Sequence, residues 1–409
     1  MTAENLNNEA NRCFLCKNAR CQKHCPINTP VPEIIKLYKE ERFDEAGKIL
    51  FENNPFSIVC AIVCPHEDQC YGNCIRNIKD VGVKFFEIEK FISEKYLGSL
   101  ELKKGENNSK SIAIVGGGPA GITSALMLSQ KGFRVTIFEA KEKIGGMLTY
   151  GIPEYRLDRK IIKKYEDTLI NLGVKIRYST LISETIDINK LKSEYDAVLI
   201  SNGVWSPKSV SIKGETLGNC HYAIDYLSAN KSYDLKEEVI VIGAGNVAMD
   251  AARTAKRNGS NVRVVYRKDE CDMVATNMEI QEAKDDDVEF DFFKSPVEIN
   301  KDGVVFVECR KEINEDKSFK MINIEDSEKL IKCDNVIIAI GQNPRNEITN
   351  KTSIETDRVG HIKVNKCGQT SIDGVFSAGD IVTGAKTVVL AVDGAKKVSL
   401  EIEKYLLNK

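Results

Sequence analysis

The stretch Ser111-Ile-Ala-Ile-Val115-Gly116-Gly117-Gly118-Pro119-Ala120-Gly121 decides the fold of this chain. It joins a short apolar run, typical of a buried strand, to a glycine turn, and an apolar helical pattern then continues to Leu128. Glycines spaced as Gly116-x-Gly118-x-x-Gly121 let the backbone turn tightly and approach a pyrophosphate at the positive end of the following helix. The stretch therefore predicts the first strand, turn and helix of a dinucleotide-binding α/β fold.

The next strand strengthens this interpretation. Residues Arg134–Phe138 form a second apolar run and end at Glu139, 23 residues beyond Gly116. A carboxylate at that distance suits a hydrogen bond to a ribose hydroxyl. The residues predicted to bind this first dinucleotide are accordingly Gly116, Gly118, Pro119, Ala120, Gly121 and Glu139.

The same arrangement recurs in the second half of the chain. The strand Glu238–Ile242 leads into Gly243-Ala244-Gly245-Asn246-Val247-Ala248, where alanine replaces the third glycine, and a helix follows. The next strand, Asn261–Val265, is followed by Tyr266-Arg267-Lys268, where the first unit has an acid. Because cations pair with a 2′-phosphate, Arg267 and Lys268 predict a preference for NADP(H) over NAD(H). The alternative is an ordinary solvated pair after a strand.

An acid in the first unit and bases in the second indicate FAD followed by a nicotinamide nucleotide, with hydride transfer between them. Near the C-terminus, Gly374–Asp380 is predicted to be a strand ending in an aspartate, and such an aspartate reaches the ribityl-phosphate part of FAD in two-dinucleotide flavoproteins. A helix beginning at Thr387 would then point towards the flavin. These features add Gly379, Asp380 and Thr387 to the FAD candidates.

The second dinucleotide domain is predicted to be inserted in the first. The crossings are expected near Ser201–Gly203 and Val336–Gln342. Ala339 and Gly341, at the second crossing, join the NADP candidates Gly243, Ala244, Gly245, Asn246, Val247, Arg267 and Lys268.

A polar, charged linker, Lys103–Lys110, precedes the first strand. We therefore expect an α/β chain in which an α-helical iron–sulfur domain, residues 1–105, precedes two Rossmann-like dinucleotide-binding domains. The FAD domain takes residues 109–232 and 339–409, and the NAD(P)H domain takes residues 233–338.

Eight of the thirteen cysteines lie between positions 13 and 74. They form two compact sets, Cys13-x2-Cys16-x4-Cys21-x3-Cys25 and Cys60-x3-Cys64-x5-Cys70-x3-Cys74, each with one Cys-Pro step. Structural zinc usually takes two short pairs with a longer spacer, and a disulfide framework needs an oxidising compartment. The spacing therefore favours ferredoxin-type iron–sulfur ligation, with two [4Fe–4S] clusters sharing eight candidate ligands by exchange.

Helical apolar spacing is predicted over residues 31–52 and again over residues 85–92. Glu89 lies on the second of these helices among apolar neighbours. On this pattern alone, a solvated glutamate is the simpler interpretation.

No protein residue is expected to act as a catalyst, since the cofactors carry the chemistry. Flavin disulfide reductases share this layout, but they need a redox-active cysteine pair beside the flavin. The later cysteines are far apart in sequence: Cys220, Cys271, Cys309, Cys333 and Cys367. The four histidines, which show no metal or triad spacing, are His24, His66, His221 and His361. Electrons are therefore expected to leave through the clusters.

The 409 residues include 58 basic and 60 acidic side chains, for a formal net charge of −2. This balance predicts no nucleic-acid-binding surface. The apolar runs are shorter than the ~20 residues that a membrane-spanning helix needs, and the polar N-terminus has no signal-peptide core. We expect a soluble, cytoplasmic protein without a membrane or nucleic-acid partner.

The chain resembles the small, beta-type subunit of bacterial NADPH-dependent glutamate synthase. It is also similar to the N-terminal half of dihydropyrimidine dehydrogenase and to the separate bacterial flavoprotein subunit of that enzyme. The resemblance spans nearly the whole sequence. It rests on both cysteine sets, on Asn53-Asn54-Pro55, on Gly145-Gly-Met-Leu-Thr-Tyr-Gly-Ile-Pro-Glu-Tyr-Arg-Leu157 and on Ala378-Gly-Asp-Ile-Val-Thr-Gly384.

The resemblance implies a role for individual residues. One cluster would be held by Cys13, Cys16, Cys21 and Cys74. The other would be held by Cys25, Cys64 and Cys70 with Glu89 as fourth ligand, the glutamate synthase arrangement, whereas the pyrimidine enzyme has glutamine. Cys60 would then bind no metal. FAD contacts are implied for Gly146, Met147 and Arg156.

The resemblance further implies an electron-input flavoprotein that takes electrons from NADPH, or NADH, through FAD and two clusters. Neither a glutaminase domain nor an FMN barrel fits in this chain, so a catalytic FMN subunit is the expected partner: a glutamate synthase large chain, or the barrel subunit of dihydropyrimidine dehydrogenase. The leading hypothesis is a glutamate synthase small chain. The alternative is the flavoprotein subunit of dihydropyrimidine dehydrogenase or of a ferredoxin-linked transhydrogenase, with ferredoxin as a further partner. From a different class, the alternative is a zinc-bearing nucleotide-sensing or scaffold protein.

Overall fold

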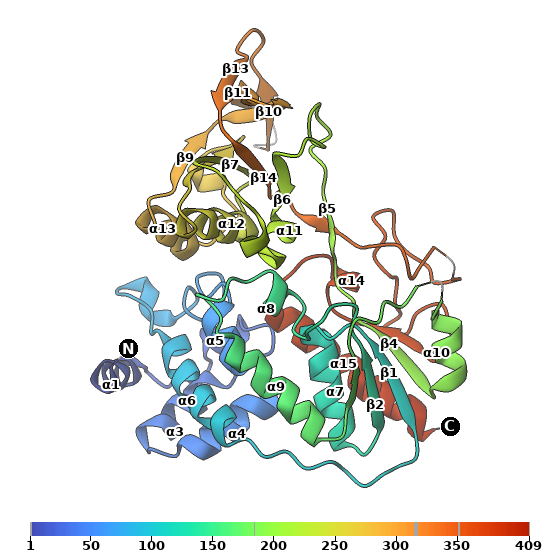
Figure 1. Cartoon of the computed structure of the whole chain (residues 1–409). Helices are drawn as coiled ribbons and strands as arrows, with labels where there is room; N and C mark the ends of the chain where they lie inside the picture. The colour runs from blue at the N-terminus through green and yellow to red at the C-terminus, as the bar shows by residue number, and fades with distance from the viewer. Residues whose placement is uncertain (1, 184, 315–317, 351, 409) are drawn as a thin grey trace. The chain divides into compact units, whose positions relative to one another are not determined.

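The computed structural model describes residues 2–183, 185–314, 318–350 and 352–408. The chain divides into two compact units (Figure 1). The first combines Met1–Thr149, Glu154–Val204 and Pro344–Lys409, and the second combines Tyr150–Pro153 and Trp205–Asn343. The first unit therefore contains the cysteine-rich region and the first glycine turn, and the second contains the other glycine turn.

The N-terminal part of the first unit is helical. Its longer helices pack around a core that includes the fully buried Ile34, Leu50 and Ile88. A helix expected over residues 31–52 is interrupted at Glu41, whose φ of 57° cannot continue a right-handed helix. The helices are α1 (Ala3–Arg12), α2 (Arg20–Lys23), α3 (Val31–Lys39), α4 (Phe43–Asn53), α5 (Ser57–Val63) and α6 (Phe85–Ser99), with the 3₁₀ turn Ile75–Ile78.

The rest of the first unit is a parallel five-stranded sheet in the order β16-β4-β1-β2-β3. Helix α10 covers one face through Ile188 and Leu191, while α7, α9 and α15 lie on the opposite side (Figure 1). The strands are β1 (Ser111–Val115), β2 (Arg134–Phe138), β3 (Lys175–Arg177), β4 (Ala197–Ile200) and β16 (Val375–Ser377). The helices are α7 (Pro119–Gln130), α8 (Met147–Tyr150), α9 (Arg159–Asn171), α10 (Ile188–Glu194), α14 (Asp380–Thr383) and α15 (Val388–Leu407).

The second unit repeats this design with the parallel order β6-β14-β7-β8-β9. Alternating side chains of its strands face two cores: Val239 and Val241 of β7 pack with the helices, whereas Ile240 and Ile242 pack with an antiparallel sheet. The parallel strands are β6 (Cys220–Tyr222), β7 (Glu238–Ile242), β8 (Asn261–Tyr266), β9 (Glu289–Phe292) and β14 (Asn335–Ile338). The helices are α11 (Ala223–Ser228), α12 (Asn246–Arg257) and α13 (Asn277–Asp285), with 3₁₀ turns at Asn230–Ser232 and Glu270–Asp272.

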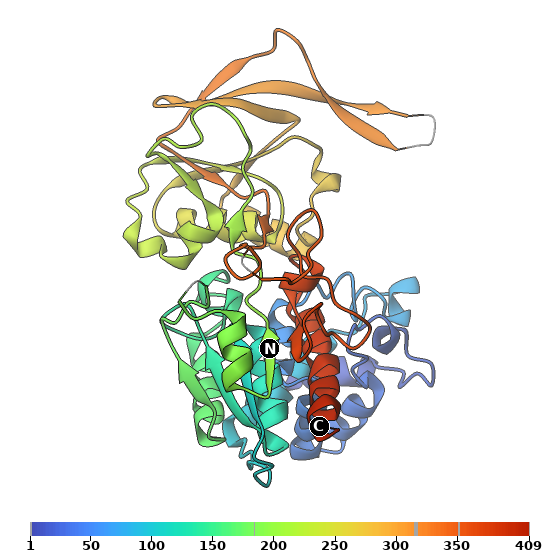
Figure 2. The ribbon, with the colours of Figure 1, turned by 90° about the vertical axis from the view of Figure 1, so that its right-hand side faces the viewer.

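A long antiparallel ribbon covers the other face of this second sheet (Figure 2). It consists of β10 (Lys294–Asn300), β11 (Gly303–Ile313), β12 (Phe319–Asn323) and β13 (Lys329–Lys332). The far part of β11 pairs with β12, and the near part pairs with β10 and β13. The sequence pattern of these residues did not predict the ribbon.

Two short strands join at the crossings between the units. β5 (Ser206–Pro207) and β15 (Gln342–Asn343) form an antiparallel pair. The units divide at residues 204 and 343, close to the crossings expected from the sequence but before the domain boundary expected at residue 232. The reason is that β6 pairs with β14, which draws the segment after residue 204 into the second unit.

The helical N-terminal region packs directly on the first sheet's helices. The rings of Phe56 and Tyr165 stack 4.4 Å apart, and the Tyr165 hydroxyl donates a 2.6 Å hydrogen bond to the Pro55 carbonyl. Lys396 of α15 donates to the Glu52 carbonyl at 3.0 Å. Residues 1–105 and the first sheet are therefore one compact unit. Among the described helices, none combines the length and the apolar character needed to cross a bilayer.

We expect Tyr165→Phe to weaken this packing. The substitution keeps the stacked ring but leaves the Pro55 carbonyl, buried at the contact, without its donor. The free energy of unfolding in urea should fall by about 1–2 kcal/mol. Tyr195→Phe is the matched control, because the Tyr195 hydroxyl makes no hydrogen bond within the described residues, and it should shift the value by less than about 0.5 kcal/mol. Equal effects of the two substitutions would contradict this role of the hydroxyl.

Candidate functional site

The first glycine turn lies at the carboxyl end of β1, and its glycines serve different purposes. Gly116 has a φ of 102°, and a Cβ atom added there would lie 2.6 Å from the Ser201 carbonyl oxygen. A Cβ on Gly121 would lie 2.0 Å from the Gly116 oxygen. The fold itself therefore requires these two glycines. Gly118, the N-cap of α7, is different, because an added Cβ would meet nothing closer than the Gly146 Cα at 3.9 Å.

Glu139 lies beside this turn at the end of β2. Its side chain is buried, and its two oxygens accept 2.8 Å hydrogen bonds from the backbone N–H groups of Gly117 and Lys141. Burial raises the pKa of Glu139, and these two donors partly oppose the rise. The carboxylate is thus held in a fixed position next to the turn, as the ribose role requires.

Two later segments meet the same turn. Gly146 has a φ of 54°, and a Cβ there would lie 2.9 Å from the Gly118 Cα, while the Gly145 N–H donates to the Gly117 carbonyl at 2.7 Å. Met147 begins α8, and Arg156 is half-buried in the segment between α8 and α9. From the C-terminal part, Gly379 has a φ of 81°, and its added Cβ would lie 3.0 Å from the Ala120 Cβ.

The N-terminus of α15 carries a buried hydroxyl with no hydrogen-bond partner in the described part of the chain, that of Thr387. Burial also raises the pKa of the Asp380 carboxyl, at the start of α14, to about 7. An orphaned donor, a side-chain-free N-cap at Gly118 and a buried carboxylate at Glu139 fit a bound dinucleotide of the FAD type. The structure brings most of the predicted FAD residues to this carboxyl edge of the first sheet.

The second glycine turn has the same architecture in the second unit. Gly243 has a φ of 135°, and an added Cβ would lie 2.3 Å from the Ala339 carbonyl oxygen at the end of β14. Gly245 caps α12, which begins with Asn246 and Val247, and an added Cβ on Gly245 would have no neighbour within 4 Å. Gly341, with a φ of 104°, follows directly after Ala339 and Ile340. These positions fit a second dinucleotide.

The two cations after β8 are held differently. Arg267 is exposed and makes no hydrogen bond or ion pair that the described residues show. The Lys268 ammonium lies 5.2 Å from the centre of the Phe319 ring. Neither side chain forms an ion pair with a carboxylate among the described residues.

The eight N-terminal cysteines divide between two cavities. The outer cysteine cavity, about 330 Å³, is lined by Cys13, Cys16, Cys21 and Cys74 together with Phe14 and Arg76. The inner cysteine cavity, about 340 Å³, is lined by Cys25, Cys60, Cys64, Cys70 and Glu89. Each cavity thus takes cysteines from both sequence sets, which is the exchange expected for two-cluster ferredoxin-type ligation.

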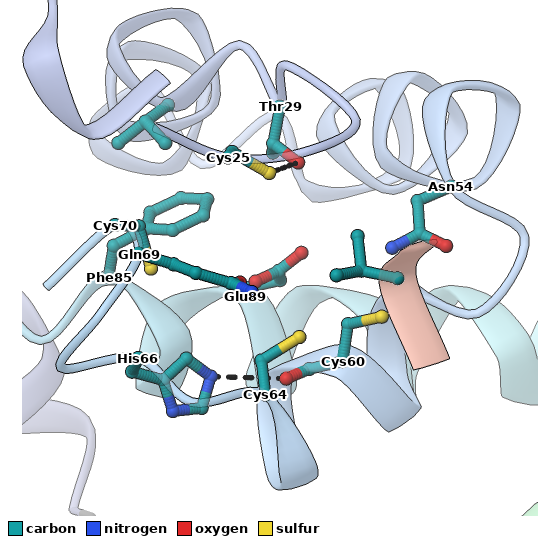
Figure 3. A pocket seen from close by; sticks show the side chains of 12 residues that line it. Cys25, Thr29, Asn54, Cys60, Cys64, His66, Gln69, Cys70, Phe85 and Glu89 are labelled. Atoms are coloured by element: carbon teal, nitrogen blue, oxygen red, sulfur yellow. Dashed lines mark hydrogen bonds between the residues drawn. The ribbon is translucent and has the colours of Figure 1, made fainter. Parts of the chain in front are cut away.

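Glu89 projects into the inner cysteine cavity. Figure 3 shows its carboxylate pointing between the segment that carries Cys25 and the helix that carries Cys60 and Cys64. The Glu89 side chain is only 6% exposed, and burial, then the neighbouring Cys60, raises the pKa of its carboxyl well above the usual range. Burial also raises the pKa of Cys70. The wall of this cavity contains acidic groups, the cysteine thiols and Glu89, but no lysine or arginine. Buried acidic groups can ionise only beside a positive charge, and the iron ions of an iron–sulfur cluster would supply that charge.

The inner cavity includes a histidine to which the sequence analysis gave no role. His66 is buried, its Nε2 lies 3.1 Å from the Cys60 carbonyl oxygen, and its ring stacks on Phe86 at 4.3 Å. Burial lowers its pKa to about 4. In the sequence, the position of His66 directly after Cys64-Pro65 could have indicated that this side chain lies near the cysteines. Within the described residues, no three His, Cys, Asp or Glu side chains converge as ligands of a single metal ion.

Comparison with known proteins identifies the class. The family model for pyridine nucleotide-disulphide oxidoreductases matches residues 110–395. The model described as dihydropyrimidine dehydrogenase domain II, 4Fe-4S cluster, matches residues 1–99. The chain therefore belongs to the pyridine nucleotide-disulphide oxidoreductase family, and the α/β fold class with a preceding iron–sulfur region is confirmed.

Individual relatives narrow the class. The chain is 30% identical to the small chain of NADPH glutamate synthase of Escherichia coli, over 97% of this chain and 91% of that one. It is also 30% identical to the PreT subunit of an NAD-dependent dihydropyrimidine dehydrogenase of Salmonella typhimurium, over 97% and 94%. A solved structure of FprA from Mycobacterium tuberculosis with NADPH shares the fold, with a TM-score of 0.64 and 19% identity over 73% of this chain and 85% of that one. This protein is an NAD(P)H-dependent flavin and iron–sulfur oxidoreductase of the glutamate synthase small-chain type, which confirms the resemblance.

Gly118→Ala tests the first turn. The protein has room for this methyl group, so the variant should fold normally, yet the methyl would occupy space that a pyrophosphate needs. FAD binding should weaken by roughly tenfold or more, about 1.4 kcal/mol, measured as the flavin retained per chain and the FAD dissociation constant. Gly98→Ala, which also has open space, is the control and should keep its flavin. If Gly118→Ala kept its full affinity for FAD, the prediction that this turn binds the pyrophosphate would be wrong.

Proposed function

We propose that this chain is the electron-input subunit of an NADPH-dependent glutamate synthase. It oxidises NADPH and passes the electrons, through FAD and two [4Fe–4S] clusters, to a partner subunit that carries FMN. NADH is a weaker alternative donor. The partner is a glutamate synthase large chain.

The proposal assigns each cofactor to residues of this chain. FAD is held by Gly116, Gly118, Pro119, Ala120, Gly121, Glu139, Gly146, Met147, Arg156, Gly379, Asp380 and Thr387. NADPH is held by Gly243, Ala244, Gly245, Asn246, Val247, Arg267, Lys268, Ala339 and Gly341. The outer cluster is held by Cys13, Cys16, Cys21 and Cys74, and the inner one by Cys25, Cys64, Cys70 and Glu89.

When bound, FAD takes up a hydride and gives up single electrons, which iron–sulfur clusters carry onward. The protein's part is binding and positioning. Gly118 and Gly245 leave the N-termini of α7 and α12 clear of side chains, where backbone N–H groups attract phosphate. Glu139 orients the ribose of one dinucleotide, and Arg267 attracts the 2′-phosphate of the other. No protein side chain has to donate or accept a proton.

One observation carries the proposal: α15 takes part in both sites of the first unit. Thr387, with its orphaned hydroxyl, caps this helix at the FAD edge, and Val389 of the same first turn lines the inner cysteine cavity. The FAD edge and the inner cysteine cavity thus each take a residue from the start of α15. This closeness supports direct electron passage from the flavin site to the inner cavity.

The surface around the outer cysteine cavity supports a partner subunit. Phe14, in the cavity wall, is 65% exposed, and Ile78 and Val81 are 64% and 51% exposed. These side chains lie on adjoining segments, because Arg76 stacks on Phe14 at 4.9 Å and Arg12 donates to the Val81 carbonyl. Exposed apolar side chains gathered at one place are typical of interaction surfaces. A partner seated here would lie next to the outer cavity.

A second candidate is the flavoprotein subunit of a dihydropyrimidine dehydrogenase, because the Salmonella subunit of that enzyme matches this chain over nearly its whole length. Anoxic isolation of the native complex, followed by mass spectrometry, separates the two. A large partner with glutaminase and FMN-barrel regions is the expected result. A small FMN-barrel partner would overturn the glutamate synthase assignment in favour of pyrimidine reduction.

Glu89→Ala should remove the inner cluster, because the carboxylate is its fourth ligand. Iron per chain, measured by plasma mass spectrometry after anoxic purification, should fall from about eight towards four. Cys60→Ser is the matched control in the same cavity and should keep all its iron, with the electron paramagnetic resonance spectrum of the reduced protein unchanged. If Cys60→Ser lost iron and Glu89→Ala kept it, Cys60 and not Glu89 would be the fourth ligand.

Replacing Arg267 and Lys268 together by alanine should raise the KM for NADPH by about tenfold or more, since two cations that pair with the 2′-phosphate are lost. The KM for NADH should change by less than about twofold. Arg263→Ala is the control, because Arg263 lies on β8, the strand that leads to Arg267 and Lys268, but is already paired with Glu289 at 2.7 Å. Equal changes in the KM for NADPH and for NADH would contradict the assignment of these cations to the 2′-phosphate.

A further inference from the structure

The far end of the antiparallel ribbon reaches the cations that follow β8. This β11–β12 arm consists of Cys309–Ile313 and Phe319–Asn323, paired in antiparallel register (Figure 2). Two ammonium groups lie against one ring of the arm: Lys268 is 5.2 Å and Lys311 is 5.0 Å from the centre of Phe319. The ring therefore brings a residue of the β8 loop and a residue of the arm together.

The arm is joined to the β8 loop by further contacts. The Cys309 N–H donates to the Phe293 carbonyl at 2.7 Å, and the Phe293 N–H donates to the Lys268 carbonyl at 3.3 Å. Lys311 pairs with Asp272 at 2.5 Å. The arm is thus attached at its backbone and through an ion pair, and does not merely pass nearby.

The charges at this place favour an anion. Asp272 is the acid that Lys311 neutralises, and the bond from Lys311 lowers the pKa of the Asp272 carboxyl. Neither Lys268 nor Arg267 forms an ion pair with a carboxylate within the described residues, although Asp272 is close enough for Lys268 to lower its pKa as well. An aromatic ring that holds a cation adds no net negative charge, whereas a carboxylate that pairs with a cation offsets its charge. Arg267 and Lys268 therefore add positive charge where β8 ends, and no ion pair within the described residues holds either of them.

The two faces of the arm differ. Strand residues alternate between faces, so Lys311 and Ile313 share one face, on which Phe319 lies opposite Ile313. Glu312 and Lys320 pair with each other on the other face at 2.9 Å. The first face carries the Phe319 ring, against which Lys268 and Lys311 both lie.

We propose that the β11–β12 arm determines the nucleotide specificity of this protein: Phe319 positions the Lys268 ammonium for a 2′-phosphate, and Lys311 cancels the charge of Asp272 that would repel it. The ligand class is an adenosine phosphate that carries a 2′-phosphomonoester. The inference rests on the proposed NADPH function and adds two residues to it.

Binding of small adenosine phosphates to the holoprotein tests the arm without any turnover. Calorimetry would compare adenosine 2′,5′-bisphosphate with adenosine 5′-monophosphate. Phe319→Leu and Lys311→Met should each weaken binding of the bisphosphate by about five- to tenfold and leave binding of the monophosphate unchanged. Lys320→Met, on the opposite face, is the matched control and should change neither.

Two further variants separate positioning from general damage to the ribbon. Phe319→Tyr keeps the ring and should bind the bisphosphate like the wild type. Adding Asp272→Asn to Lys311→Met should restore most of the lost affinity, because no charge is left to cancel. Melting temperatures would show that all variants are folded.

The outcomes distinguish the two levels of the proposal. If Arg267→Ala weakens bisphosphate binding while Phe319→Leu and Lys311→Met do not, the arm has no role and the NADPH assignment stands. If the wild type does not prefer the bisphosphate over the monophosphate, the proposed NADPH function itself fails. Equal losses for both ligands in the arm variants would also overturn the specificity role.

Discussion

The burial of acidic side chains in the inner cysteine cavity is the constraint on which the rest of the first unit depends. Glu89 and the thiols of Cys60, Cys64 and Cys70 share a cavity that no lysine or arginine lines. Ionised groups in such a place need a compensating positive charge. Under the proposed function an iron–sulfur cluster supplies that charge, so the folding of the N-terminal helices and the binding of the metal become one equilibrium.

The same cavity explains why the helical region and the first sheet form one compact unit. A wall residue of the cavity, Val389, comes from α15. Tyr165 donates a hydrogen bond to the Pro55 carbonyl just before the cysteine helix α5, and Lys396 donates to the Glu52 carbonyl at the end of α4. Under the proposed function, a cluster held here could not shift relative to the FAD edge without breaking these contacts. Electron transfer depends steeply on distance, and the packing therefore serves the function and the stability together.

Much of the fold was predictable because its signals are local. The strands Ser111–Val115, Arg134–Phe138 and Glu238–Ile242 have the bounds predicted from their apolar runs, since the following turn residues end each run. The antiparallel ribbon was not predicted, because its strands bury residues only in part and its partners are set by the fold. The place of β6 in the second sheet was missed for the same reason: three residues carry too little pattern to name a neighbour.

By itself, the sequence determined the chemistry available to this protein: eight clustered thiols, two glycine turns, an acid after one and cations after the other. Those features are local, because spacing along the chain decides which backbone conformations and ligand sets are accessible. Only the tertiary structure decided that His66 faces the inner cysteine cavity and that Phe319 meets Lys268. Such contacts join residues far apart in sequence, and only the packing of the elements brings them together.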